Sequence, residues 1–128
     1  MVTIVTRGIK VSVETFYQNE YSNSLTQDYM FAYRITIINN GLKPVKLLRR
    51  HWFIVDAFGA VKQVEGEGVV GEQPNLLPGA SFQYVSGCGL KTEIGKMYGT
   101  YLFKEIEEDS LFYATIPEFK LICNEKLN

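Results

Sequence analysis

The chain has 128 residues, of which 46% are hydrophobic, and its 13 Lys and Arg against 14 Asp and Glu give a formal net charge of -1. This size is typical of one compact domain with one hydrophobic core, so we expect a single domain over residues 1–128. The charge balance argues against nucleic-acid binding, and no apolar run approaches the ~20 residues of a membrane-spanning helix, so we expect no membrane insertion.

The amino terminus and the cysteines of the chain indicate its cellular compartment. Its amino terminus lacks the apolar stretch of a signal peptide, which predicts a cytoplasmic protein. Its two cysteines, Cys88 and Cys123, are therefore expected to stay reduced, because a single disulfide is not a stabilising framework and the cytoplasm keeps thiols free.

Apolar and polar residues alternate along most of the chain, which is the pattern of half-buried strands. The first predicted strand covers 9–13, and the polar loop that follows at 18–28 is too long for a tight hairpin, so it either crosses between sheets or hangs exposed. The other predicted strands, in chain order, are 29–38, 45–57, 61–64, 81–85, 97–103 and 111–122. The segment 45–57 is apolar at both odd and even positions, which predicts a central strand.

About seven short strands separated by close turn signals predict an all-β fold. The absence of sustained helical periodicity favours an antiparallel β-sandwich of the immunoglobulin or fibronectin type III kind. Trp52, in the third strand, is expected to fill the core between the sheets. Residues 87–89, Gly-Cys-Gly, are expected to begin an irregular stretch.

Residues 66–71, Gly-Glu-Gly-Val-Val-Gly, have the glycine spacing of the dinucleotide-binding fingerprint. That fingerprint requires a helix after the glycines, and Pro74 and Pro78 exclude a regular helix here. Three glutamates in and around the loop would also repel phosphates. We therefore expect no Rossmann-type cofactor site.

Two interpretations of this glycine loop stay open. The backbone N–H groups around Gly66, Gly68 and Gly71 could form an anion-binding nest for pyrophosphate. Alternatively, the glycines serve a tight strand-to-strand connection with positive φ angles, and Val69 and Val70 plug it into the core. The structural interpretation is favoured because of the crowded glutamates.

Several stretches of this sequence together resemble the ApaG family. The resemblance extends over nearly the whole chain and includes the glycine run and the closing segments from Met97 onward. Its most specific residues are Arg50, His51, Trp52, Glu72, Gln73, Pro74, Ser86, Gly87 and Cys88. One departure is Gly89, which stands where the family pattern has proline and is expected to make that segment more flexible.

The resemblance implies a fibronectin type III-like sandwich without a defined reaction. Bacterial members are linked by genetic context to diadenosine tetraphosphate hydrolysis and by phenotype to cobalt resistance and magnesium efflux. Related domains in a eukaryotic F-box protein and in a polymerase-interacting protein resemble protein-binding modules. We therefore expect a partner protein, with homodimer formation as an open alternative.

The residue inventory favours binding over catalysis. His51 is the only histidine, and a lone histidine among bulky neighbours is more often structural than catalytic. The sequence lacks the spaced cluster of histidine, cysteine and carboxylate ligands that would predict a metal site. The acidic turn at 105–110 could still hold a divalent cation weakly. We expect a non-enzymatic binding module, with no cofactor; the alternative is a regulatory sensor of a nucleotide polyphosphate.

Overall fold

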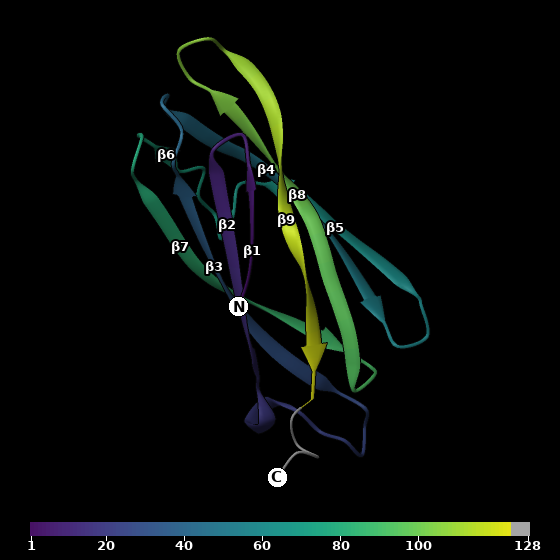
Figure 1. Ribbon diagram of the computed structural model, residues 1–128. Helices are drawn as coiled ribbons and strands as arrows, with labels where there is room; N and C mark the ends of the chain where they lie inside the picture. The colour runs from purple at the N-terminus through teal and green to yellow at the C-terminus, as the bar shows by residue number, and fades with distance from the viewer. Residues whose placement is uncertain (124–128) are drawn as a thin grey trace.

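The computed structural model describes residues 1–123, which form two antiparallel β-sheets packed face to face (Figure 1). The first sheet has the spatial order β1-β2-β3-β7 and consists of β1 (Val2–Thr6), β2 (Ile9–Tyr17), β3 (Tyr29–Asn39) and β7 (Ser81–Leu90). The second has the order β5-β4-β8-β9 and consists of β4 (Val45–Asp56), β5 (Val61–Glu67), β8 (Ile94–Glu105) and β9 (Ser110–Ile122), with the short β6 (Asn75–Leu76) paired to β4.

The predicted all-β, immunoglobulin-like sandwich is confirmed. The described residues form nine strands rather than about seven, because β1 and β6 were not predicted. β1 lies at a sheet edge and exposes most of its side chains, so it shows no clear alternation. β6 has only two residues, too few for any periodicity.

The core follows from the alternation of side chains along each strand. In β3 every odd-numbered residue from Tyr29 to Asn39 is buried, and every even-numbered one is partly exposed. This alternation is the pattern expected of a half-buried strand, because successive side chains of a strand point to opposite sides of the sheet. β4 lies between β5 and β8, which confirms the prediction of a central strand.

The sandwich has one closed side and one open side. β1 and β9 meet on the closed side, where the backbone N–H of Thr115 donates to Thr6 Oγ1 at 3.2 Å. The opposite edges are β7 in the first sheet and β5 in the second, and neither pairs with a further strand among residues 1–123. Within residues 1–123, β1 and β9 are edge strands that pack against each other, whereas the edges of β5 and β7 lie open on the opposite side.

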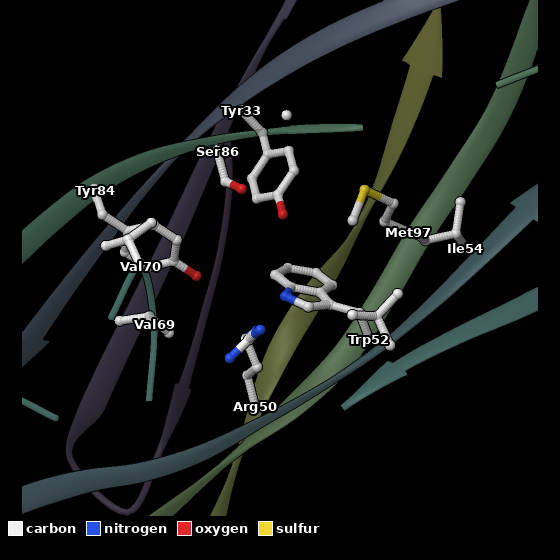
Figure 2. Close-up of a pocket in the computed structure, with 11 residues that line it drawn as sticks. Tyr33, Arg50, Trp52, Ile54, Val69, Val70, Tyr84, Ser86 and Met97 are labelled. Atoms are coloured by element: carbon white, nitrogen blue, oxygen red, sulfur yellow. The ribbon is translucent and has the colours of Figure 1, made fainter. Parts of the chain in front are cut away.

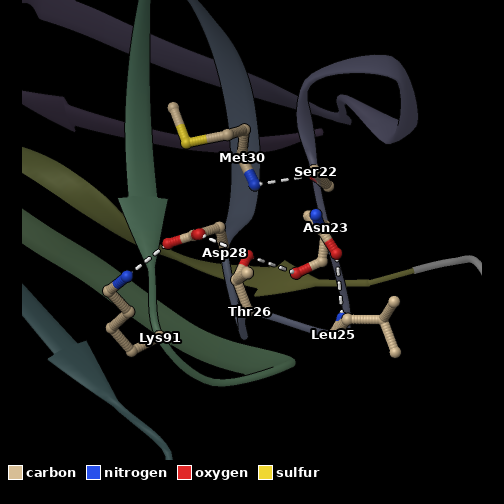
Figure 3. Close-up of polar contacts among 7 residues, drawn as sticks. All are labelled: Ser22, Asn23, Leu25, Thr26, Asp28, Met30 and Lys91. Carbon is tan, nitrogen blue, oxygen red and sulfur yellow. Dashed lines mark hydrogen bonds and ion pairs between the residues drawn. The ribbon is translucent and has the colours of Figure 1, made fainter.

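The polar loop 18–28 joins β2 to β3, which are neighbours in one sheet, so it does not cross between sheets. The loop is exposed on the surface, which was the second of the two expectations, and hydrogen bonds of its own side chains hold it in place (Figure 3). Ser22 Oγ accepts from the Met30 N–H at 2.9 Å, and Thr26 Oγ1 donates to Asp28 at 2.6 Å. Asp28 also pairs with Lys91 at the end of β7, which ties the loop to the neighbouring strand.

The prediction of an irregular stretch at residues 87–89 is wrong, because these residues belong to β7. Gly87 is paired with Ala32 and Gly89 with Met30 of β3. Gly89 is thus held in a strand rather than in a flexible loop. Glycine within a strand often marks a close approach, and a Cβ at Gly89 would lie 2.9 Å from Met30 Sδ.

Candidate functional site

A cavity of about 230 Å³ opens between the two sheets on the side of β5 and β7. Its polar side chains come from three strands: Tyr33 from β3, Arg50 and Trp52 from β4, and Tyr84 and Ser86 from β7. Figure 2 shows the hydroxyl, guanidinium and indole nitrogen groups of these residues directed toward the same space. The cavity is therefore a point where hydrogen-bond donors from both sheets meet.

Arg50 supplies the positive charge of this cavity. Its Nη1 donates to the carbonyl oxygens of Glu67 at 3.0 Å and Gly68 at 3.1 Å. A Cβ added at Gly66 would lie 2.8 Å from Arg50 Nη1, so glycine at this position leaves room for the guanidinium. No carboxylate among residues 1–123 forms an ion pair with Arg50.

Arg49 and Arg50 are adjacent but lie on opposite faces of the second sheet. Arg49 is exposed on the outer face, whereas Arg50 is partly buried and lines the cavity with Trp52. This separation results from the two-residue repeat of a strand, which sends neighbouring side chains to opposite sides.

Tyrosine hydroxyls form the second part of the cavity. Tyr84 and Tyr101 hydrogen-bond through their hydroxyls, and the Ser86 side chain lies beside Tyr33 (Figure 2). Burial raises the pKa of Tyr33, Tyr84 and Tyr101, and the smaller effect of the Arg50 charge acts in the opposite direction. All three phenols are therefore protonated at neutral pH and can donate a hydrogen bond.

Trp52 is 3% exposed and lies in the core between the sheets, as predicted. Its ring packs edge-on against Tyr33 at a centroid distance of 5.5 Å and against Phe119 at 5.8 Å. The indole nitrogen is directed toward the cavity and Arg50 (Figure 2). The ring is thus fixed by packing while its N–H faces the open space.

The glycine loop forms one wall of this cavity and carries the chain from β5 in one sheet to β7 in the other. Three of its backbone donors have acceptors within the chain: Gly68 N–H donates to Leu48 O at 2.8 Å, Val69 N–H to Glu72 O at 2.8 Å, and Glu72 N–H to Val69 O at 2.9 Å. An anion nest at this loop would have to compete with these three bonds.

Only part of the expected glycine geometry is present. Gly68 and Gly71 have positive φ angles of +61° and +81°, whereas Gly66 is an ordinary residue of strand β5. Val69 is fully buried, as expected, but Val70 is 53% exposed. Val70 does not plug the loop into the core, because it stands at the tip of the turn with a positive φ of 44°.

The residues Glu72, Gln73 and Pro74 hold the crossing segment against β4. Gln73 Nε2 donates to Leu48 O at 2.9 Å, and Pro74 O accepts from Leu47 N–H at 3.0 Å. Gln73 and Pro74 thus hold the end of the glycine loop against β4.

His51 lies outside this cavity, on the outer face of the second sheet. Its Nδ1 is 3.0 Å from Glu65 Oε1, its Nε2 is 2.9 Å from Gln63 Oε1, and its ring stacks on Phe53 at 4.5 Å. Cys88 faces the interior from β7, and burial raises the pKa of its thiol. The two residues that nucleophilic catalysis would combine are therefore on opposite faces of different sheets.

Residues 1–123 contain no group of three or more histidine, cysteine and carboxylate side chains arranged to hold a metal ion. In the acidic turn, Lys43 Nζ pairs with Glu105 at 3.2 Å and with Glu108, and Lys104 Nζ pairs with Asp109 at 2.6 Å. A divalent cation at this turn would have to displace these lysines.

Comparison with known proteins decides the family. A family model described as the ApaG domain matches residues 19–105, which is more than half of the chain. The chain belongs to the ApaG family. The matched range includes the cavity residues, the glycine loop and the most specific residues of the resemblance, whereas the closing segment beyond residue 105 lies outside it.

Relatives extend this assignment over almost the whole length. The ApaG protein of Brucella suis biovar 1 is 50% identical over 126 residues, covering 98% of this chain and 96% of the relative. The ApaG protein of Paramagnetospirillum magneticum is 46% identical over 121 residues, covering 94% and 92%. A crystal structure of an ApaA protein from Bordetella pertussis superposes with a TM-score of 0.88 at 44% identity, covering 91% of this chain and 94% of that one. In this ApaG domain, no helix within residues 1–123 is long and apolar enough to span a bilayer.

The sequence reasoning singled out Arg50, Trp52 and Ser86 as residues of the family pattern but did not bring them together as a site. It also missed the hydroxyls of Tyr33 and Tyr84 as donors. The available signal was the presence of tyrosine at inward positions of predicted strands, where a buried hydroxyl needs a partner.

Proposed function

We propose that this ApaG-family chain is a non-enzymatic binding module that recognises a partner protein at the open side of its sandwich. The observation that carries the proposal is the position of the donor-lined cavity beside β7, a strand with a free edge. A free strand edge offers a row of backbone donors and acceptors to which an extended segment of another chain can pair.

The open side has further features that suit an interface. A second cavity of about 180 Å³ lies farther along it, between Lys62 of β5 and Leu90 of β7. Val85 of β7 is 58% exposed on the outer face of the same edge. The two cavities follow the same two strands, so one extended partner segment could contact both.

Catalysis is disfavoured by the chemistry of the cavity. It contains donors and one cation, but its lining has no carboxylate, histidine or thiol that could serve as a general base or nucleophile. Groups of this kind bind and orient an acceptor without activating a nucleophile. We therefore propose binding without turnover.

The family is associated with cobalt resistance and magnesium efflux, and we propose that the partner protein accounts for this association. A binding module of this kind would affect cation homeostasis by acting on a cytoplasmic protein of that system. The alternative function, sensing of a nucleotide polyphosphate by the glycine loop, has less support because the loop amides of Gly68, Val69 and Glu72 already have acceptors.

Site-specific photo-crosslinking in the native cell tests this function. A benzoylphenylalanine at Val85 or Lys62 is expected to crosslink a partner, whereas the same group at Tyr113, which is 65% exposed on β9, is the matched control on the closed side. A crosslink to a second copy of the chain would identify the partner as a homodimer. Crosslinks only from Tyr113 would contradict the proposed surface, and hydrolysis of diadenosine tetraphosphate by the purified chain would contradict the absence of turnover.

A further inference from the structure

We infer that the cavity between the sheets receives the side-chain carboxylate of a glutamate or aspartate from an extended partner segment that runs along β7. This inference rests on the proposed function, because it names the group that the partner inserts. The donors of Arg50, Trp52, Tyr33, Tyr84 and Ser86 form the receptor for that carboxylate.

The charge of the cavity selects an anion. Arg50 is the only charged side chain of its lining, and no carboxylate of residues 1–123 neutralises it. Its Nη1 is held by Glu67 O and Gly68 O, which fixes the guanidinium in place and leaves its other N–H groups for a ligand. A preorganised guanidinium is a strong receptor for a carboxylate because it can donate two parallel hydrogen bonds.

The neutral groups also favour an acceptor. The indole N–H of Trp52 can only donate. Tyr33 and Ser86 each bring an O–H donor to the lining. Of the Tyr84 and Tyr101 pair only Tyr84 lines the cavity, and its O–H is available to a ligand when Tyr101 is the donor of their shared bond. Burial keeps these phenols protonated, so the cavity presents donors from several directions to one small group.

The size and apolar lining of the cavity suit a small side chain. Typical pockets for drug-sized ligands have volumes of roughly 300–1,000 Å³, and this cavity, at about 230 Å³, is smaller. Ile54, Val64 and Met97 provide apolar lining that suits the methylene groups of a glutamate side chain.

The neighbouring surface extends the charge complementarity. Lys62 lines the second cavity along the same edge and has no ion pair among the described residues. Asp56 also lines this cavity, but its Oδ1 accepts from the backbone N–H groups of Phe58 and Ala60, and Lys91 there is paired with Asp28. An acidic residue placed in the cavity at Arg50, followed along the strand by a second acidic residue near Lys62, would satisfy both cations. The expected partner motif is therefore an extended segment with acidic side chains.

NMR titration of the purified chain tests this inference, because Trp52 is its only tryptophan and gives a single indole N–H signal. The probes are the peptide acetyl-Thr-Val-Glu-Val-Thr-amide, its Gln counterpart, and inorganic phosphate and pyrophosphate. We expect a saturable shift of the Trp52 signal with the Glu peptide and roughly tenfold weaker binding of the Gln peptide, since a hydrogen-bonded ion pair is replaced by a neutral contact.

Variants assign the effect to the cavity. Arg50→Gln is expected to weaken Glu-peptide binding at least tenfold, whereas Arg49→Gln removes the same charge from the outer face and should leave binding unchanged. Because Arg50→Gln also removes the bonds to Glu67 O and Gly68 O, Tyr33→Phe serves as a second variant, which keeps the ring and removes one donor. Tyr33→Phe should weaken binding severalfold while the spectrum stays that of the folded chain.

The inference is overturned if both peptides bind equally, if phosphate or pyrophosphate binds more tightly than the Glu peptide, if Arg49→Gln has the larger effect, or if no probe shifts the Trp52 signal up to roughly 10 mM. If the peptides do not bind but Val85 does crosslink a partner, the carboxylate receptor is contradicted and the partner-binding function is not. Failure of both experiments would sink both.

Discussion

The hydroxyls of Tyr84 in β7 and Tyr101 in β8 hydrogen-bond across the interior of the sandwich and join its two sheets. Tyr101 is fully buried and Tyr84 is 7% exposed, so the Tyr101 hydroxyl has no bulk water as an alternative partner, and the Tyr84 hydroxyl faces only the cavity. The net contribution of such a hydrogen bond to the free energy of unfolding is small, but removing one hydroxyl is costly because the other is then left buried without a partner. The pair lies beside the cavity and fixes the orientation of the Tyr84 ring.

Removal of one hydroxyl from this pair is expected to destabilise the fold. Tyr84→Phe or Tyr101→Phe should each lower the free energy of unfolding by about 1–3 kcal/mol, because the remaining hydroxyl is left buried without its partner. The double variant should cost less than the sum of the two single ones. Urea denaturation of the four proteins measures this, and additive losses would contradict a direct bond.

Alkaline pH should weaken the fold through the same tyrosines. Burial raises the pKa of Tyr84 and Tyr101 above the ordinary value of 10.0. Below that value both states are protonated and the contribution is fully present; above it the unfolded chain ionises while the folded chain does not, so the free energy of unfolding falls as pH rises. Denaturation at increasing pH measures the slope. The Tyr84→Phe/Tyr101→Phe variant should show a smaller slope, and an unchanged slope would contradict the assignment.

The glycine loop depends on Gly68 more than on Gly71. Both have positive φ, but a Cβ at Gly68 would lie 2.1 Å from Glu72 O, whereas a Cβ at Gly71 meets no atom within 4 Å. Gly71→Ala should therefore cost about 1 kcal/mol from backbone strain alone. Gly68→Ala should cost roughly 2–3 kcal/mol, because the clash also opens the loop. Thermal or urea denaturation compares them, and equal losses would show that the loop relaxes freely.

Asn39 should be a stabilising residue at the end of β3. It is 1% exposed, its Nδ2 donates to Lys43 O at 2.8 Å and Leu76 O at 3.0 Å, and its Oδ1 accepts from Gly41 N–H at 2.9 Å. Asn39→Ala is expected to lower the free energy of unfolding by roughly 2–3 kcal/mol, because buried backbone groups lose their partners. Asn40→Ala, at the exposed neighbour, is the control and should change stability by less than about 0.5 kcal/mol. A similar loss in both would contradict this role.

Divalent cations should bind the acidic turn only weakly. Lys43 pairs with Glu105 and Glu108, so we expect Mg²⁺ to bind there with a Kd on the order of 1 mM or weaker. Lys43→Gln should tighten binding severalfold by freeing both carboxylates. NMR titration of the turn amides measures it, with Lys120→Gln as the control for the loss of one charge. Equal affinity in the two variants would show that Lys43 does not compete with the ion.

Short-range pattern was sufficient for most of the fold. The alternation along β3 and the two-sided apolar character of β4 determined which strands form, which side of each is buried and which strand lies at the sheet centre. These properties follow from the two-residue repeat of a strand together with burial of apolar surface, so they depend only on residues that are close in the sequence. Where the local pattern was weak, as in the exposed β1, the two-residue β6 and the glycines of β7, prediction failed.

The candidate site needed the tertiary structure. The sequence identified Arg50, Trp52 and Ser86 as residues of the ApaG family, and it identified the glycine run as a connection rather than a Rossmann site. It could not place Tyr33, Arg50 and Tyr84 around one cavity, because their approach depends on the pairing of β3 with β7 and on the packing of one sheet against the other.

The sequence by itself therefore determined the class of fold, the family and the inward or outward direction of most side chains, since these depend on local periodicity and on residue identity. Only the tertiary structure decided that one side of the sandwich is open, that Gly66 makes room for the Arg50 guanidinium, and that donors from both sheets converge there. Those relationships join residues far apart in the chain, and strand order and sheet packing, which no local pattern encodes, bring them together.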